Sequence, residues 1–129
     1  MLDAGGVEIP ADLDGRTLRP LLSENGDVNW PDDIFAEFHG YESTLFSQRM
    51  VRTKSWKYIY NPGAEDELYD VDSDPGELRN LAETYGYKHV LRRMKARLVK
   101  WLERTGDTIA EDDDWKGSGY DLYLSEREK

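Results

Sequence analysis

The chain has 129 residues, of which 38% are hydrophobic, and this is enough for one domain with a modest core. Its 27 acidic and 17 basic residues give a net charge of −10, which repels a nucleic-acid backbone, so we expect no nucleic-acid partner. The absence of cysteine excludes disulfides, thiolate catalysis and cysteine-ligated zinc. No stretch approaches the roughly 20 apolar residues of a membrane span, and no signal-peptide pattern follows Met1. We therefore expect a soluble chain without a membrane partner, in a compartment that the sequence leaves open.

The first 22 residues alternate apolar side chains with turn-forming pairs such as Gly5-Gly6 and Asp14-Gly15. This pattern predicts an irregular path with one short helical turn near Thr17 to Leu22. The apolar residues of this segment are Val7, Ile9, Leu13, Leu18, Leu21 and Leu22.

The middle of the chain has the composition of a small antiparallel sheet. Strand-forming residues predict strands at about 34–39 and 45–53, and a hairpin whose second strand follows the polar break Lys54-Ser55. A turn at 61–63 then leads to a further strand at Leu68-Tyr69. In the first strand, alternation places Ile34, Ala36 and Phe38 on one face, which is apolar.

Two helices are expected after the sheet. Asp74-Pro75-Gly76-Glu77 has the order of an N-cap, a first-turn proline and a capping-box glutamate, so it predicts a short helix. From Tyr87 to Thr105 the apolar residues recur every three or four positions, which predicts a long amphipathic helix covering one face of the sheet. Gly106 is placed to end that helix in a left-handed conformation. The predicted fold class is therefore α+β, with about four antiparallel strands and one long helix packed on one face.

Residues 107–129 differ from the rest of the chain. Glu111 to Asp114 is a run of four acidic residues, yet Trp115 and the stretch from Tyr120 to Leu124 are too apolar for a fully solvated tail. We expect this acidic tail to dock in part on the domain.

Several sequence blocks, in order, resemble the C-terminal subdomain of the sulfatases, enzymes of the alkaline phosphatase superfamily. The blocks are Glu37-Phe38-His39-Gly40, Gln48-Arg49-Met50-Val51-Arg52, Trp56-Lys57-Tyr58-Ile59, Glu67-Leu68-Tyr69-Asp70, and Asp74-Pro75-Gly76-Glu77 followed by Asn80-Leu81. Residues 1–22 are similar to the segment that closes a sulfatase catalytic domain. The resemblance thus divides the chain into that segment, a C-terminal α+β domain at 23–106, and the acidic tail at 107–129.

The chemistry that the resemblance implies needs residues that this sequence does not supply. Sulfatases use a formylglycine made from the Cys or Ser of a (C/S)-x-P-x-R motif, together with Ca²⁺ or Mg²⁺. The sequence Ser73-Asp74-Pro75-Gly76-Glu77 has glutamate where arginine is required, and Asp70 to Asp74 lacks the glycine and glutamate of a calcium-binding EF-hand loop. We expect no catalytic residue, metal site or cofactor in this chain, with formylglycine and the metal belonging to a catalytic domain.

Four residues are candidates for lining the substrate mouth of such an enzyme. The resemblance directs the end of the first strand, with Glu37 and His39, toward the catalytic domain. Arg49 and Arg52 lie three positions apart on one strand, so they face opposite ways and only one can join the pair. The simpler interpretation of all four is ordinary salt bridging on the sheet surface or between domains.

The predicted function is that of the C-terminal domain of a sulfatase-like hydrolase, which cleaves sulfate esters or sulfamates when joined to its catalytic domain and is inactive alone. One alternative is a non-catalytic binding module from a truncated sulfatase, and another is the matching domain of a phosphonate or phosphate monoesterase. The expected partner is a catalytic domain or, through uncovered apolar surface on the opening segment and on the Phe35 face of the first strand, a second copy in a homodimer.

Overall fold

The computed structural model describes residues 2–13, 15–22, 29–40, 47–107, 109 and 125. The chain divides into two compact units, Met1–Pro31 and Asp32–Lys129. The domain limits predicted from the sequence, at residues 22 and 106, stay predictions.

The first unit is mostly irregular, as predicted, with two short 3₁₀ helices at Asp3–Gly5 and Arg19–Leu22. The Asp3 carboxylate accepts hydrogen bonds from the Thr17 hydroxyl and, at 3.3 Å, from the Arg19 guanidinium. These bonds hold the second 3₁₀ helix against the first. The apolar side chains of the segment stay exposed, with Leu18 59% and Leu22 83% accessible.

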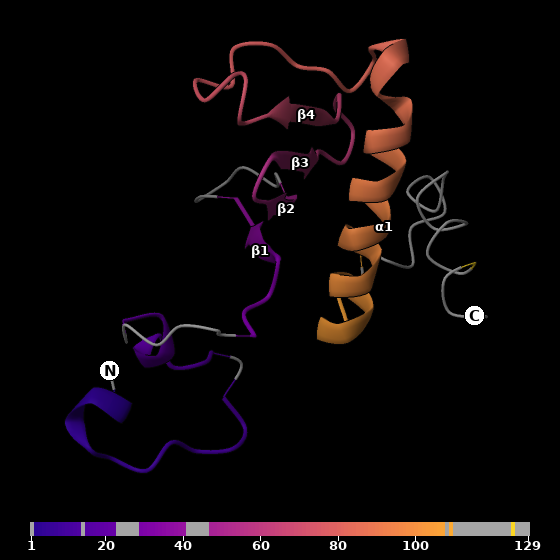
Figure 1. Ribbon diagram of the computed structural model, residues 1–129. Helices are drawn as coiled ribbons and strands as arrows, with labels where there is room; N and C mark the ends of the chain where they lie inside the picture. The colour runs from indigo at the N-terminus through magenta and orange to yellow at the C-terminus, as the bar shows by residue number, and fades with distance from the viewer. Residues whose placement is uncertain are drawn as a thin grey trace. The chain divides into compact units, whose positions relative to one another are not determined.

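The second unit is built on a four-stranded antiparallel sheet in the order β1-β2-β3-β4. The strands are β1 (Asp33–Phe38), β2 (Gln48–Thr53), β3 (Trp56–Tyr60) and β4 (Glu67–Asp70). Each strand pairs with the next, so the sheet is a meander, as Figure 1 shows. The predicted strands are confirmed, although the first two residues of the range expected for β2 lie outside the described residues.

The β2–β3 turn forms at the polar break expected from the sequence. The Thr53 hydroxyl lies 3.1 Å from the Trp56 amide, which donates a hydrogen bond to it, and 3.3 Å from the Trp56 carbonyl. These two hydrogen bonds between Thr53 and Trp56 close the turn around Lys54 and Ser55. The closed turn fixes the strand register, in which Val51 pairs with Tyr58.

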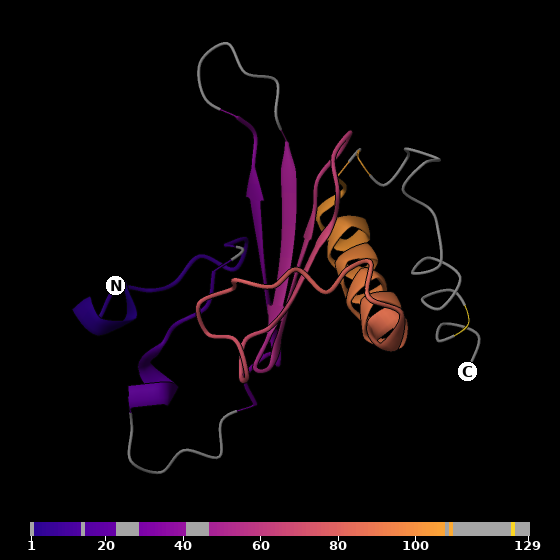
Figure 2. The same ribbon diagram turned by 90° about the horizontal axis from the view of Figure 1, so that it is seen from above.

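Helix α1 (Lys88–Thr105) follows a short 3₁₀ turn at Tyr85–Tyr87 and packs along one face of the sheet. Figure 2 shows α1 on a single side of the strands. Its stripe buries Met94, Leu98 and Leu102 against Val51 and Tyr58. Gly106 ends the helix with φ of 67°, as predicted. Glycine has no Cβ, so it adopts this left-handed conformation at little energetic cost. Within the described residues, no helix is long and apolar enough to cross a membrane.

The predicted short helix at Asp74 to Glu77 is wrong, since these residues form turns. Asp74 does act as a local cap, because its carboxylate accepts a hydrogen bond from the Arg79 amide at 2.9 Å. However, Glu77 has φ of 53°, which no right-handed helix allows, and its carboxylate binds Lys57 of β3. A long-range ion pair therefore prevails over a local helix signal.

The expected exposure of the Phe35 face of β1 is also wrong. Phe35 is partly buried on the helix side, with its ring stacked on Trp101 at a centroid distance of 5.5 Å. The apolar residues of β1 that remain uncovered are on the other face, where Ile34 is 53% and Phe38 48% exposed. Helix α1 packs on the face of β1 that has fewer apolar residues. It does so because the buried residues of the neighbouring strands, Val51 of β2 and Tyr58 of β3, lie on that same face of the sheet.

Only three residues of the acidic tail are described, namely Asp107, Ile109 and Ser125. Ile109 packs against the hydrophobic core. The acidic run and the apolar stretch from which docking was predicted lie outside the described residues.

Candidate functional site at the end of β1

The candidate site lies where β1 ends and β2 begins. Antiparallel register places Glu37 directly opposite Arg49, so both side chains are on the helix face of the sheet. His39 follows β1 one residue after its end and shares the parity of Glu37. Three of the four residues predicted from the sequence are thereby brought together.

Arg49 is the buried centre of this group, with only 5% of its side chain exposed. It makes a bidentate ion pair with Asp107, in which Nε lies 2.5 Å from Oδ2 and Nη2 lies 3.2 Å from Oδ1. Its Nη1 donates to the Ser47 hydroxyl at 2.7 Å and to the Gln48 carbonyl at 2.9 Å. The guanidinium is therefore locked in one orientation.

Asp107 is charged in this setting despite its burial. Burial alone raises the pKa of the Asp107 carboxyl, but hydrogen bonds from Arg49 and from the Ile109 amide more than offset it. The result is a pKa below its ordinary value, with a further contribution from the charge of His39. A charged ion pair thus lies beneath the exposed residues of the site.

Glu37 and His39 form the exposed part of the site. Their side chains are 47% and 63% exposed, and His39 Nε2 lies 3.6 Å from Glu37 Oε1. The second Glu37 oxygen lies 3.9 Å from Arg49 Nε. A carboxylate acceptor and an imidazole, which donates when protonated, therefore lie side by side at the surface, where they can bind a polar ligand.

Arg52 does not belong to this group. It is exposed on the opposite face of β2, and its register partners are Ile34 and Lys57. The parity argument from the sequence is confirmed for the two arginines, since Arg49 joins Glu37 and His39 while Arg52 does not. The role of any of the four at a substrate mouth stays a prediction.

Sequence reasoning missed Asp107 and Ser47, which hold the guanidinium of Arg49. Asp107 is 58 residues from Arg49 in the sequence and was assigned to the tail. Its position directly after Gly106 was the available signal, because a charged residue just after a helix end is held in place by that helix.

The described residues do not fit the metal that the sulfatase resemblance implies. They contain no cluster of three or more His, Asp or Glu side chains that could hold a metal ion. The Asp70 carboxylate instead lies 3.2 Å and 3.3 Å from the backbone amides of Asp72 and Ser73. These residues therefore form a hydrogen-bonded turn, and no catalytic step is assigned to a metal here.

Several known proteins similar to this chain are sulfatases. The family model described as "N-sulphoglucosamine sulphohydrolase, C-terminal" matches residues 1–104. A Delta 4,5-hexuronate-2-O-sulfatase from Bacteroides thetaiotaomicron is 34% identical over 109 residues, covering 83% of this chain and 23% of that protein. Human arylsulfatase K is 42% identical over 91 residues, or 64% of this chain and 17% of that protein.

The fold is shared as well. A solved structure of a 2-O GAG sulfatase superposes with a TM-score of 0.76 at 30% identity, over 90% of this chain and 27% of that one. The chain thus spans about a quarter or less of the length of these relatives. It belongs to the family of N-sulphoglucosamine sulphohydrolase C-terminal domains, within the sulfatases.

Proposed function

We propose that the chain serves as the C-terminal domain of a hydrolase for sulfate esters or sulfamates of sugars, and that it is inactive without its catalytic domain. Membership in the family supports the first part, and the names of its relatives, a hexuronate sulfatase and a GAG sulfatase, support a sugar substrate. Formylglycine and Ca²⁺ or Mg²⁺ belong, in this proposal, to the catalytic domain.

The observation that carries the proposal is the exposed pair Glu37 and His39 above the buried Arg49–Asp107 pair. A buried ion pair fixes the end of the sheet, so the two exposed side chains are held on a rigid support. His39 in its charged form attracts a sulfate oxygen, and Glu37 accepts a hydrogen bond from a sugar hydroxyl. Their proposed role is to position the substrate, and the reacting atoms lie in the catalytic domain.

The proposed partner is a sulfatase catalytic domain that packs against the uncovered apolar residues. In the second unit these include Ile34 and Phe38 on the face of β1 that α1 leaves open. The opening segment adds exposed side chains of its own, among them Val7 and Leu18. A second copy of the chain is the alternative partner for the apolar residues of either unit.

The substitution His39→Gln in the protein joined to its catalytic domain tests the site. We expect a rise in KM for a sulfated disaccharide of about three- to thirtyfold with a smaller change in kcat, because a positioning contact to the substrate is lost. His89→Gln is the matched control, since His89 is exposed on α1 and should leave both constants unchanged. Equal effects of the two substitutions would contradict the assignment.

Two alternatives make different predictions in the same protein. A non-catalytic module would bind a sulfated sugar without supporting hydrolysis by any catalytic domain. A phosphonate monoesterase would hydrolyse a phenyl phosphonate monoester faster than the matched aryl sulfate. The relatives described above are sulfatases, so neither alternative is better supported than the main proposal.

A further inference from the structure

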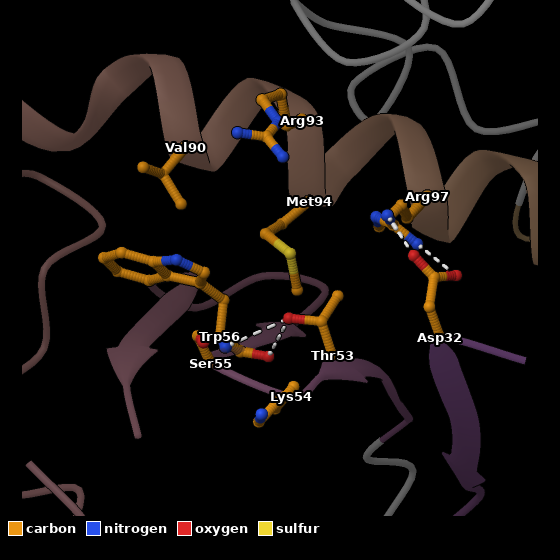
Figure 3. Close-up of a pocket in the computed structure, with 9 residues that line it drawn as sticks. All are labelled: Asp32, Thr53, Lys54, Ser55, Trp56, Val90, Arg93, Met94 and Arg97. Atoms are coloured by element: carbon orange, nitrogen blue, oxygen red, sulfur yellow. Dashed lines mark hydrogen bonds and ion pairs between the residues drawn. The ribbon is translucent and has the colours of Figure 1, made fainter. Parts of the chain in front are cut away.

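A cleft lies at the end of the sheet opposite to the Glu37–Arg49 group. Its volume is about 310 Å³, and it is lined by the β2–β3 turn residues 53–56, by Val90, Arg93, Met94 and Arg97 of α1, and by Asp32. Figure 3 shows α1 above the cleft and the turn below it, with Trp56 near one end and the Asp32–Arg97 pair at the other. All of these residues belong to the second unit.

Two of the cations that border this cleft have no side-chain partner among the described residues. In the part of the chain that the structure describes, neither Lys54 nor Arg93 forms an ion pair or hydrogen bond through its side chain, and both are exposed. Arg97 by contrast binds both Asp32 and Asp33, with Nη2 of Arg97 lying 2.7 Å from Asp32 Oδ2. The charges lining the cleft are three cations and one carboxylate, so two positive charges are left over.

The helix reinforces this charge. Helix α1 carries seven Lys and Arg residues and one Glu, a net charge of +6, within a chain whose net charge is −10. Basic residues thus concentrate on the one element that forms the upper wall of the cleft. Part of this charge is neutralised, because Lys95 pairs with Asp66 and Arg97 pairs with Asp32 and Asp33. The remaining positive charge, to which Arg93 contributes at the cleft, attracts anions although the whole chain is acidic.

The remaining lining suits a ligand with both apolar and hydroxyl groups. The Trp56 indole contacts the Tyr87 ring at a centroid distance of 5.8 Å, and with the largely buried Val90 and Met94 it forms an apolar wall. The Thr53 hydroxyl is engaged with the Trp56 backbone. Within the described residues the Ser55 hydroxyl makes no hydrogen bond, so it is available to a ligand.

We propose that this cleft is a second binding site, which takes an anionic group of a sulfated saccharide between Lys54 and Arg93, with the sugar ring against Trp56. Thr53 is four residues beyond Arg49 on β2, so the cleft is about 13 Å from the Glu37–Arg49 group along the strand. The choice of a saccharide rests on the proposed function, whereas the anion site rests on the cleft alone.

Titration of the 129-residue chain with a fully sulfated heparin hexasaccharide tests this proposal. Binding is measured by calorimetry, and its location by the shifts of the Lys54 and Ser55 backbone amides in NMR spectra. We expect the double substitution Lys54→Gln with Arg93→Gln to weaken binding about tenfold. The control is Arg79→Gln together with Lys88→Gln, which removes the same charge from exposed residues that do not line the cleft.

The outcomes separate the possibilities. Weaker binding in the cleft variant only, with amide shifts at Lys54 and Ser55, supports the proposal. Equal weakening in the control variant, or shifts confined to His39 and Glu37, would overturn it. Equal affinity for polyphosphate of the same charge would overturn the saccharide assignment, and equal affinity for the desulfated hexasaccharide would overturn the role of the sulfate groups. None of these readouts depends on hydrolysis, so the proposed function can fail while the cleft assignment stands, and the reverse.

Discussion

Arg49 and Asp107 join the beginning of β2 to the first residues after α1 through a bidentate ion pair whose side chains are 5% and 8% exposed. The pair fastens the C-terminal end of the helix to the end of the sheet that carries Glu37 and His39. It therefore links the stability of the fold to the geometry of the candidate site.

The substitution Asp107→Ala should cost about 3 to 5 kcal/mol of unfolding free energy, because it leaves the buried Arg49 charge without a partner. Asp32→Ala is the control. The Asp32 carboxylate also binds an arginine, Arg97, but it is 76% exposed, so its loss should cost at most about 1 kcal/mol. Urea unfolding gives both values. Similar costs for the two variants would show that burial of the Arg49–Asp107 pair has no energetic consequence.

Acid should weaken the same pair. The pKa of Asp107 is lower in the folded chain than its ordinary value of 3.8, so its stabilisation is present above that value and is lost as pH falls through the folded pKa. The difference in unfolding free energy between the unsubstituted chain and Asp107→Asn should therefore shrink as the pH falls below about 5. The carboxyls of Asp3 and Asp32, whose pKa values are also lowered, remain in both proteins and cancel. A difference that stays constant over this range would contradict the assignment.

Glu77 has a positive φ and an ion pair with Lys57. Two substitutions isolate the effect of the positive φ on stability from the effect of the ion pair. Glu77→Ala and Glu77→Gly both remove the carboxylate, but only alanine retains a Cβ in the left-handed region. The glycine variant should therefore be more stable than the alanine variant by roughly 1 kcal/mol in thermal or urea unfolding. Greater stability of the alanine variant would mean that this turn does not hold the observed conformation in solution.

The sequence predicted those elements whose signals are local. The hairpin at Lys54-Ser55 forms because strand-forming residues flank a polar break. Helix α1 ends at Gly106 because glycine readily adopts the left-handed conformation that closes a helix. The signal at Asp74 was also local, but a contact between Glu77 and Lys57, 20 residues away, overrode it. Local patterns therefore failed where a tertiary contact fixed the backbone.

The candidate site was predictable only in part for the same reason. Alternation on one strand separates Arg49 from Arg52 without any knowledge of the fold. The pairing of Glu37 with Arg49 depends on the β1–β2 register, and the contact with Asp107 depends on how α1 lies on the sheet. Which face of β1 the helix covers was likewise decided by β2 and β3, so the prediction for Phe35 was wrong.

The exposed apolar residues predict self-association of the isolated chain. Leu22 is 83% exposed in the opening segment, and removal of such surface from water favours a second copy when no catalytic domain is present. Leu22→Lys should weaken this association, whereas Leu78→Lys, at a position 90% exposed in the second unit, should not. Sedimentation velocity over a dilution series measures the mass. A mass that stays at 15.0 kDa up to high micromolar concentration would exclude the dimer.

Hydrolysis of 4-methylumbelliferyl sulfate tests the central claim most directly. The isolated chain, with Ca²⁺ or Mg²⁺ added, should show no turnover above the blank, because its described residues bring together no metal-binding cluster and its sequence contains no (C/S)-x-P-x-R motif. The same chain joined to a sulfatase catalytic domain should support turnover. Metal-dependent turnover by the isolated chain would contradict the account, and its loss in Ser73→Ala would locate the nucleophile in the sequence that was set aside.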